Sequence, residues 1–326
     1  MAGFGGRKGS ARCVGLDVGT ASVKGLHLHR AGDRIEVVQT ERAEIPPGSK
    51  ADQRSNAVRK VLERLNYREV PLVASVGGPG TVLRRVSLPK MTPQELRSAF
   101  AFEAERYIPF KMDEVFFDFS ILAERSGGQM DVLLAAARRE LVNDLLELLA
   151  PCDVTPLAVD LEMVALTNAW IGSSQAENGV TALLHIDGMG TVLDFIRDSQ
   201  LEFAREISVG GSAFTQAVAA GLHLEVPEAE RLKCRPEGRE TEVRAAMQPA
   251  WEEWLSQCRV SFDFYEHQFG HRVERLVLSG GAARMSGFKD WIQQEASGLP
   301  TKVWDPMGND PSFAIAMGLA LRGVQR

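Results

Sequence analysis

The sequence predicts an α/β fold of two lobes with mixed sheets, and a small α/β domain inserted in the first lobe. Predicted strands alternate with predicted helices along most of the chain, which is typical of this class. A strand that ends in Asp17, followed by a Gly-Thr turn and a hairpin, has a counterpart around Asp187, which indicates a duplicated architecture. The 326 residues are also too many for one ordinary core.

The composition is that of a soluble globular protein, with 44% hydrophobic and 25% charged residues. A net charge of -6 argues against a nucleic-acid-binding face, which normally carries clustered basic charge. No apolar run reaches the roughly 18 residues that suggest a membrane span, so we expect no direct membrane insertion. Residues 1–12 lack the apolar stretch of a signal peptide and predict a flexible tail. The four cysteines have no metal-ligand spacing and fit a reducing cytoplasm.

We expect the first lobe to comprise residues 13–87 and 154–175. Apolar runs broken by Gly19-Thr20 and by Gly32-Asp33 predict strands joined by tight turns. A later apolar run is typical of a buried parallel strand. The predicted strands cover 14–16, 23–28, 35–38, 70–76 and 154–160, and the predicted helices lie around 58–65 and over 161–170.

Residues 88–153 are expected to form the inserted domain, which a strand over 82–88 introduces. Thr92 and Glu95 predict a capping box at a helix start, with Pro93 at the first helical position. Alternating residues over 115–121 indicate a half-buried strand. A further strand over 131–137 and a helix over 138–150 complete the domain.

We expect the second lobe to comprise residues 178–212 and 270–326, with a helical subdomain over 213–269. A long amphipathic stretch in that subdomain carries an apolar side that is more typical of a core than of a binding surface. The predicted strands cover 182–186, 192–197, 201–207, 273–278 and 302–304, and the predicted helices 212–222, 227–233, 241–269, 285–296 and 313–322.

The segment 17–24 carries the strongest chemical signal. Gly19, Thr20 and Ser22 form a turn between strands, and such a turn can direct backbone N–H groups at phosphate oxygens. Asp17 ends the first strand, where it is placed to bind Mg²⁺ through water, because hydrated Mg²⁺ favours one or two carboxylates. Lys24 lies on the next strand and is placed to neutralise phosphate charge. An ordinary hairpin with a glycine turn would give the same pattern.

Two further glycine-bearing turns occur in the second half of the chain. Asp187, Gly190 and Thr191 occupy the place that matches the first turn. Near the end of the chain a predicted strand runs into a diglycine, and glycines there allow a flat ring or a ribose to approach the backbone closely. The candidates in this third turn are Gly280, Gly281 and Ala282.

In this order the three segments resemble the two phosphate motifs and the adenosine motif of the actin, heat-shock ATPase and sugar kinase superfamily. The resemblance implies a two-lobed actin-like fold, a duplicated ribonuclease H-like architecture. It also implies ATP or ADP between the lobes, with Mg²⁺ held through water by Asp17 and Asp187. The segment 228–233 resembles the family helix whose acidic and lysine side chains reach the ribose and adenine. This likeness assigns nucleotide contacts to Glu230 and Lys233.

Within the superfamily, the inserted segment is similar to that of the PilM family of type IV pilus assembly proteins. Residues 103–110, EAERYIPF, carry the most specific likeness, which extends over nearly the whole chain from 13 to 323. Within the similar stretch 205–215, Gly210 and Gly211 are further nucleotide-binding candidates. The resemblance implies a small domain beside the first lobe, in the position found in the division protein FtsA.

One departure from the superfamily concerns the second phosphate turn. Met189 stands where the family usually has glycine, and Thr191 comes about two residues early. The shorter turn either still reaches a phosphate through Gly190 and Thr191 or weakens nucleotide binding. Asp160, at a strand-to-helix junction, is the candidate catalytic residue that orients a water, and a helix cap is the alternative reading.

The PilM resemblance implies a cytoplasmic ATP-binding scaffold, a weak ATPase at most, at the inner membrane. Its expected partners are the N-terminal cytoplasmic peptide of PilN, the PilN/PilO complex, the pilus motor ATPases and further copies of itself in a ring. The peptide would lie in a groove between the first lobe and the inserted domain.

Two alternatives remain open at this point. A sugar- or acetate-type kinase would need a general base, for which the sequence offers Asp160 and Glu162. An FtsA-like filament protein usually carries a terminal amphipathic membrane helix, and no such helix is expected after residue 322.

Overall fold

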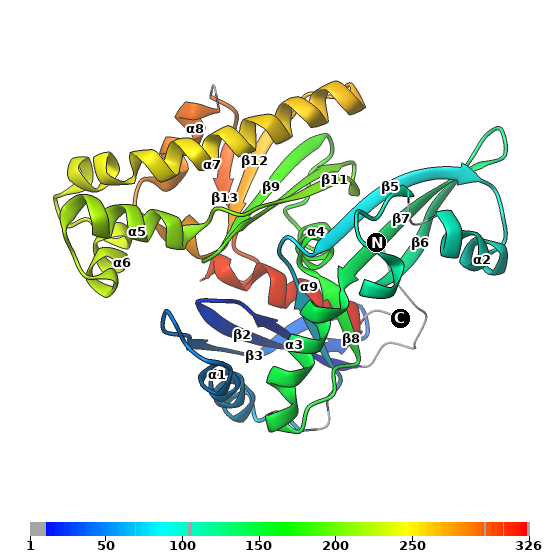
Figure 1. Ribbon diagram of the computed structural model, residues 1–326, viewed down its shortest axis with the longest axis horizontal. Coiled ribbons are helices and arrows are strands. Elements are labelled where there is room, and N and C mark those ends of the chain that lie inside the picture. Colours follow the sequence, from blue (N-terminus) through cyan, green and yellow to red (C-terminus); the bar gives the residue numbers. More distant parts are fainter. Residues whose placement is uncertain (1–10, 69, 104–105, 297, 309, 325–326) are drawn as a thin grey trace.

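The computed structural model describes residues 11–68, 70–103, 106–296, 298–308 and 310–324. Within these residues the chain forms two five-stranded sheets and one three-stranded sheet, and Figure 1 shows the two larger sheets as separate lobes with helices between and around them. The predicted two-lobed α/β fold with an additional small domain is therefore confirmed. Most of the predicted tail and residues 104–105 of the EAERYIPF segment lie outside the described residues.

The first sheet has the order β3-β2-β1-β4-β8. Strands β1, β2 and β3 are antiparallel, whereas β1, β4 and β8 are parallel. In this register Asp17 lies directly opposite Lys24 on the neighbouring strand. Helix α1 packs on one face through a buried apolar side. The bounds are β1 (Arg12–Val18), β2 (Ser22–Ala31), β3 (Arg34–Glu44), α1 (Ala51–Arg64), β4 (Leu72–Val76) and β8 (Ala158–Leu161).

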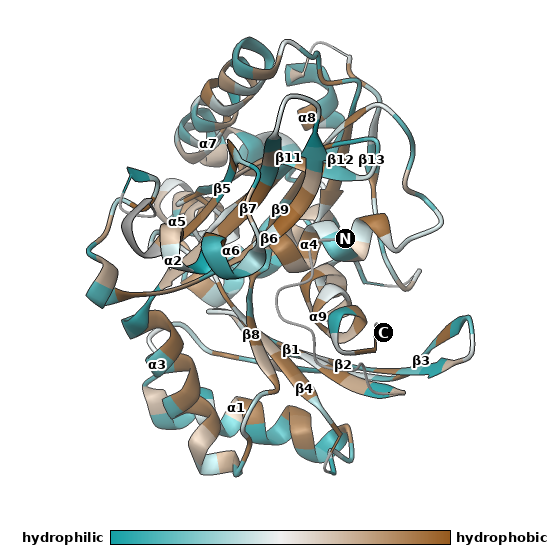
Figure 2. Ribbon diagram, turned by 90° about the vertical axis from the view of Figure 1, so that its right-hand side faces the viewer, coloured by the Kyte–Doolittle hydropathy of each residue, from teal (hydrophilic) through white to brown (hydrophobic). Residues whose placement is uncertain are grey.

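The second sheet repeats this order and these directions as β11-β10-β9-β12-β13. The duplicated architecture predicted from the sequence is thus present in the strands. Figure 2 shows hydrophobic residues along β9 and mixed colouring on the outer helix α7. The bounds are β9 (Val180–Ile186), β10 (Thr191–Arg197), β11 (Gln200–Ile207), α5 (Gly211–Leu222), α6 (Val226–Cys234), α7 (Glu240–Phe269), β12 (Arg275–Ser279), α8 (Phe288–Glu295) and β13 (Thr301–Val303).

Two helices, α4 (Glu162–Ile171) and α9 (Ala314–Val324), lie between the lobes (Figure 1). Helix α4 follows the first sheet but contacts the second, where the Thr167 hydroxyl donates to Asp194 Oδ2 at 2.8 Å. Helix α9 follows the second sheet but packs on β1 and β2 of the first. A Cβ at Gly318 would lie 1.7 Å from the Ala165 carbonyl oxygen, so the two helices touch through their backbones. The sequence predicts that all of 270–326 belongs to the second lobe, whereas α9 packs on the sheet of the first lobe.

The small domain is the antiparallel sheet β5-β7-β6 with helix α2. Its predicted capping box is present, since the Thr92 N–H donates to Glu95 Oε2 at 2.7 Å and the Glu95 N–H to Thr92 Oγ1 at 3.2 Å. The sheet begins at Thr81, before the predicted boundary at residue 88, because β5 pairs with β7. The bounds are β5 (Thr81–Pro89), α2 (Pro93–Glu103), β6 (Val115–Arg125), β7 (Gln129–Arg138) and α3 (Arg139–Leu149).

Helix α3 leaves the small sheet and packs against α1, so that Leu145 and Leu149 join the first lobe's core. Short 3-10 helices complete the fold: η2 (Met112–Glu114), η3 (Ala150–Cys152), η4 (Gly281–Arg284) and η5 (Pro311–Phe313). Among the described residues, we find no helix with the length and apolar character that crossing a bilayer requires.

Candidate functional site

The two glycine turns predicted to bind phosphates face each other across the lobes. A Cβ at Gly188 would lie 3.2 Å from Thr20 Oγ1, and one at Gly19 would lie 3.5 Å from Asp187 Oδ2. A cavity of about 420 Å³ opens at this junction. The residues predicted to bind nucleotide that line it are Gly19, Thr20, Asp187, Gly190 and Thr191.

Lys24 links the two lobes through Asp187, which lines this cavity, and through Asp17. Its ammonium group lies 3.0 Å from Asp17 Oδ2 and 2.6 Å from Asp187 Oδ2. Lys24 is fully buried and Asp17 is 1% exposed. A buried ammonium between two carboxylates from different lobes fixes the spacing between the two turns, because each separated charge would be costly to bury alone.

The three charges have unequal proton affinities. Burial raises the pKa of Asp17, and the Lys24 ammonium offsets this only in part. Burial alone would also raise the pKa of Asp187. The Lys24 ammonium outweighs this effect and lowers the pKa of that carboxyl to about 2. For Lys24, the two carboxylates outweigh the effect of burial and raise its pKa. Lys24 and Asp187 are therefore ionised at neutral pH.

Two more carboxyl groups, Glu162 and Glu206, line the same cavity. Burial raises the pKa of Glu162 well above its ordinary value, and the nearby charges of Asp17, Glu206 and Asp187 add to the effect. Burial raises the pKa of Glu206 to about 7. A Cβ at Gly77 would lie 2.4 Å from the Glu162 carboxyl carbon, so glycine at this position leaves room for that side chain.

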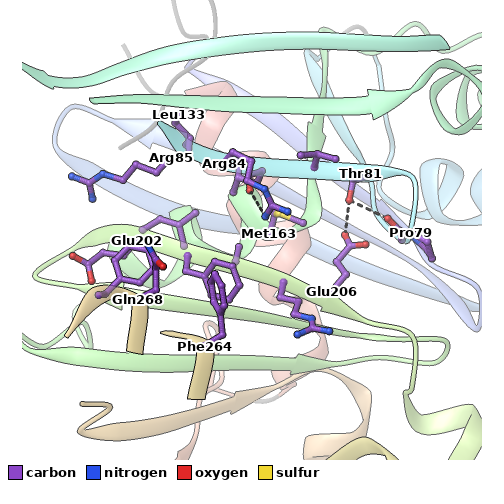
Figure 3. Close-up of a pocket in the computed structure, with 18 residues that line it drawn as sticks. Pro79, Thr81, Arg84, Arg85, Leu133, Met163, Glu202, Glu206, Phe264 and Gln268 are labelled. Atoms are coloured by element: carbon purple, nitrogen blue, oxygen red, sulfur yellow. Dashed lines mark hydrogen bonds between the residues drawn. The ribbon is translucent and has the colours of Figure 1, made fainter. Parts of the chain in front are cut away.

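A second cavity, of about 770 Å³, lies between β5 of the small domain and β11 of the second lobe. Figure 3 shows Thr81 above Glu206 at one end of this cavity, joined by a dashed line. The Thr81 hydroxyl donates to Glu206 Oε1 at 3.0 Å. Glu206 lines both cavities, so it lies between the cavity at the two glycine turns and the small domain.

Asp160 lies elsewhere, at a smaller cavity between the small domain and the first lobe. Its Oδ2 is 2.7 Å from Arg322 Nη1 on α9. The carboxyl is buried and held by this ion pair, and its other oxygen accepts from the Leu161 N–H at 2.9 Å. Asp160 therefore links β8 to α9, whereas Glu162 is one of the carboxyl groups that line the cavity at the two glycine turns.

In the shortened second turn, the Thr191 hydroxyl group is already hydrogen-bonded within the protein. Thr191 Oγ1 donates to the Val209 carbonyl at 2.8 Å and accepts from Trp254 Nε1 at 2.9 Å, so this side chain points into the core. A Cβ at Gly210 would lie 2.4 Å from the Asp187 carbonyl oxygen. Glycine is needed at this position because the second turn packs directly on the start of α5.

The residues predicted to contact the nucleoside lie next to the second turn, near Gly211 and Asp187. The Lys233 ammonium donates to the Gly211 carbonyl at 3.0 Å and to Glu230 Oε2 at 2.6 Å, and Thr215 also donates to that carboxylate. Gly280 has a positive φ of 88° and sits against the Ile186 backbone. A Cβ at Gly281 would lie 3.3 Å from Asp187 Oδ1. The structure therefore brings all three predicted motifs to one region.

The residues present fit Mg²⁺ held through water. No cluster of three or more histidine, cysteine or acidic side chains with metal-binding geometry occurs among the described residues. Asp17 and Asp187 are the two carboxylates next to the turns, and both already contact Lys24. Hydrated Mg²⁺ requires only one or two carboxylates, which these two residues supply, and the phosphate oxygens would come from a nucleotide. One oxygen of Glu206 has no hydrogen-bond partner among the described residues.

Comparison with known proteins decides the family. The model of the type IV pilus assembly protein PilM matches residues 15–324. The chain belongs to the PilM family. Its fold is also similar to that of a solved PilM-PilN type IV pilus biogenesis complex, with 26% identity, a TM-score of 0.84, and coverage of 96% of this chain and 99% of that one.

More distant structures share the actin-like fold alone. MreB 5 of Spiroplasma citri bound to AMPPNP is 12% identical with a TM-score of 0.50, and 95% of each chain is covered. The activator of 2-hydroxyisocaproyl-CoA dehydratase from Clostridium difficile with bound ADPNP is 13% identical with a TM-score of 0.51. The match covers 96% of this chain and 94% of that one. Both of these relatives were solved with a bound nucleotide analogue, AMPPNP in the first and ADPNP in the second.

Proposed function

We propose that this chain is a cytoplasmic ATP-binding scaffold of the type IV pilus assembly platform, peripheral to the inner membrane through PilN. The observation that carries the nucleotide part is the ion pair of Lys24 with Asp17 and Asp187, which joins the two phosphate turns at 3.0 and 2.6 Å. Nucleotide between these turns would replace carboxylate contacts of Lys24 with phosphate contacts. The angle between the lobes would then depend on the bound nucleotide.

Each motif has a distinct role in this proposal. The turns at Gly19 and Gly190 would hold the phosphates, Lys24 would neutralise their charge, and Asp17 and Asp187 would hold Mg²⁺ through water. Mg²⁺ supplies charge neutralisation at the phosphate oxygens. The region formed by Lys233, Glu230 and the diglycine at 280–281 would hold the nucleoside.

We assign the orientation of a hydrolytic water to Glu162 instead of Asp160. Glu162 lines the phosphate cavity, whereas Asp160 is paired with Arg322 in another cavity. The variant Glu162→Gln should lose about tenfold or more of any slow ATP hydrolysis, because the amide cannot accept the proton of water. Its nucleotide affinity should be unchanged. Asp160→Asn serves as the comparison, and a larger loss in that variant would contradict the assignment.

The PilN part of the proposal rests on a groove of about 270 Å³ between the small domain and the first lobe. Two edge strands border it, β6 of the small sheet and β8 of the first sheet. Phe116 and Phe117 on β6 line the groove and are 44% and 37% exposed. Free strand edges with apolar side-chain positions suit an extended peptide, which pairs through its backbone and inserts alternate side chains.

Calorimetry with a synthetic peptide of the cognate PilN N-terminal tail tests this part. We expect binding to the full chain and a loss of about tenfold or more in Phe117→Ala, since aromatic side chains in a pocket dominate such interfaces. Ile121→Ala is the matched control, because Ile121 is 38% exposed on the same strand but does not line the groove. Equal binding by the two variants would place the peptide elsewhere, and no binding by wild type would remove PilN from the proposal.

A further inference from the structure

Strand β3 is an exposed edge strand with apolar side chains. It ends the first sheet, and among the described residues it pairs in that sheet with β2 alone. Ile35, Val37 and Val38 are 40%, 44% and 54% exposed. Figure 2 shows the hairpin of β2 and β3 extending beyond the helices of the first lobe. A free edge presents unpaired N–H and C=O groups and is a template for pairing with another strand.

The register of β3 on β2 determines which of its side chains share a face. Residues opposite each other in an antiparallel pair point to the same face, and alternate residues of β2 share a face. The pairing shifts between His27 and Leu28, so that Val38 has no partner and the alternation along β3 changes there. One face of β3 therefore carries Arg34, Glu36, Gln39 and Glu41, which lie opposite Ala31, His29, His27 and Gly25.

We propose that a second copy of this chain pairs antiparallel with β3, with Val37 of each copy opposite Val38 of the other. In this register Arg34 lies opposite Glu41 and Ile35 lies opposite Thr40, and each pair occurs twice. Arg34 and Glu41 have no ion-pair partner within the described part of their own chain, and Glu41 only accepts from Gln39 Nε2 at 3.2 Å. Two complementary charge pairs flank an apolar centre.

Neighbouring registers are disfavoured by charge. A shift of one residue in one direction places Arg34 opposite Arg42. A shift in the other direction places Arg34 opposite Thr40 and leaves Glu41 opposite Asp33, which lies in the turn before β3. Like charges directly opposite each other destabilise a strand pair. The proposed register also places side chains of the same face opposite each other. The irregularity at Val38 puts Arg34 and Glu41 on one face of β3, so they can meet across the dimer. The edge is thus complementary to itself, which favours a closed two-fold dimer over an unlike partner.

Sedimentation velocity of the full chain over a range of concentrations tests this proposal. We expect a monomer–dimer equilibrium whose Kd rises about tenfold or more in Arg34→Glu and in Glu41→Arg, because each variant opposes like charges at two pairs. The double variant Arg34→Glu/Glu41→Arg restores the opposite charges and should recover dimerisation. Lys60→Glu, at an exposed position of α1, is the control for net charge and should dimerise like the wild type.

Three outcomes would overturn the proposal: a wild-type chain that remains monomeric up to its solubility limit, a dimer that Arg34→Glu leaves unchanged, and a double variant no stronger than the single ones. Circular dichroism of each variant separates lost pairing from lost folding. None of these results depends on nucleotide or PilN.

Discussion

Replacement of Lys24 by methionine should destabilise the folded chain by about 3–5 kcal/mol, because it removes the ammonium group that lies between two carboxylates. Methionine fills similar space, so the loss arises from charge rather than from a cavity. Asp17 is 1% exposed and would face Asp187 without a counter-ion. Urea unfolding followed by circular dichroism measures this loss. A labelled ATP analogue should also bind at least about tenfold more weakly, since the proposed ammonium–phosphate contact is lost.

The double variant Lys24→Met/Asp187→Asn is the matched control for this prediction. It removes one of the two opposed carboxylates, so it should be more stable than Lys24→Met alone. The loss of stability in each of the two variants should become smaller at acid pH, because the carboxyl groups become protonated. A Lys24→Met chain as stable as the wild type at pH 8 would show that the ion pair does not hold the turns together.

The local chemistry of the first turn could be predicted from the sequence, but the pairing across the lobes could not. The spacing from Asp17 to Lys24 placed both next to a glycine turn, and the register confirms that they lie opposite each other. The contact of Lys24 with Asp187 joins residues 163 positions apart, and only the packed lobes bring them together. The recurring strand order nevertheless indicated that two such turns exist.

The remaining differences from the sequence predictions arise where tertiary packing overrides local pattern. Thr191 resembles a phosphate-binding hydroxyl in sequence, but the short turn directs it to Val209 and Trp254. Helix α9 follows the second sheet in the chain but covers the first, which the order of elements does not specify. Glu206 belongs to no glycine turn, and its position at two cavities follows from the approach of β5 to β11.

Glu206 should make the stability of the folded chain depend on pH near neutrality. Burial raises its pKa from the ordinary value of 4.5 to about 7, while hydrogen bonds from Thr81 and the Gly78 backbone oppose the rise. The folded state therefore binds this proton more tightly than the unfolded state. The resulting stabilisation is complete below pH 4.5 and is lost as the pH rises through about 7. The full loss amounts to about 3 kcal/mol.

Glu206→Gln should remove this dependence, because the amide does not titrate. Urea unfolding at a series of pH values between 5 and 8.5 should show wild type losing stability relative to the variant, with the variant more stable above about pH 7. Thr81→Val removes one hydrogen bond to the carboxylate and should move the wild-type transition to higher pH. Parallel pH profiles for wild type and Glu206→Gln would mean that this carboxyl has an ordinary pKa. The hydrogen bond from Thr81 would then be accepted by an ionised carboxylate at neutral pH, and the cavity would hold this negative charge.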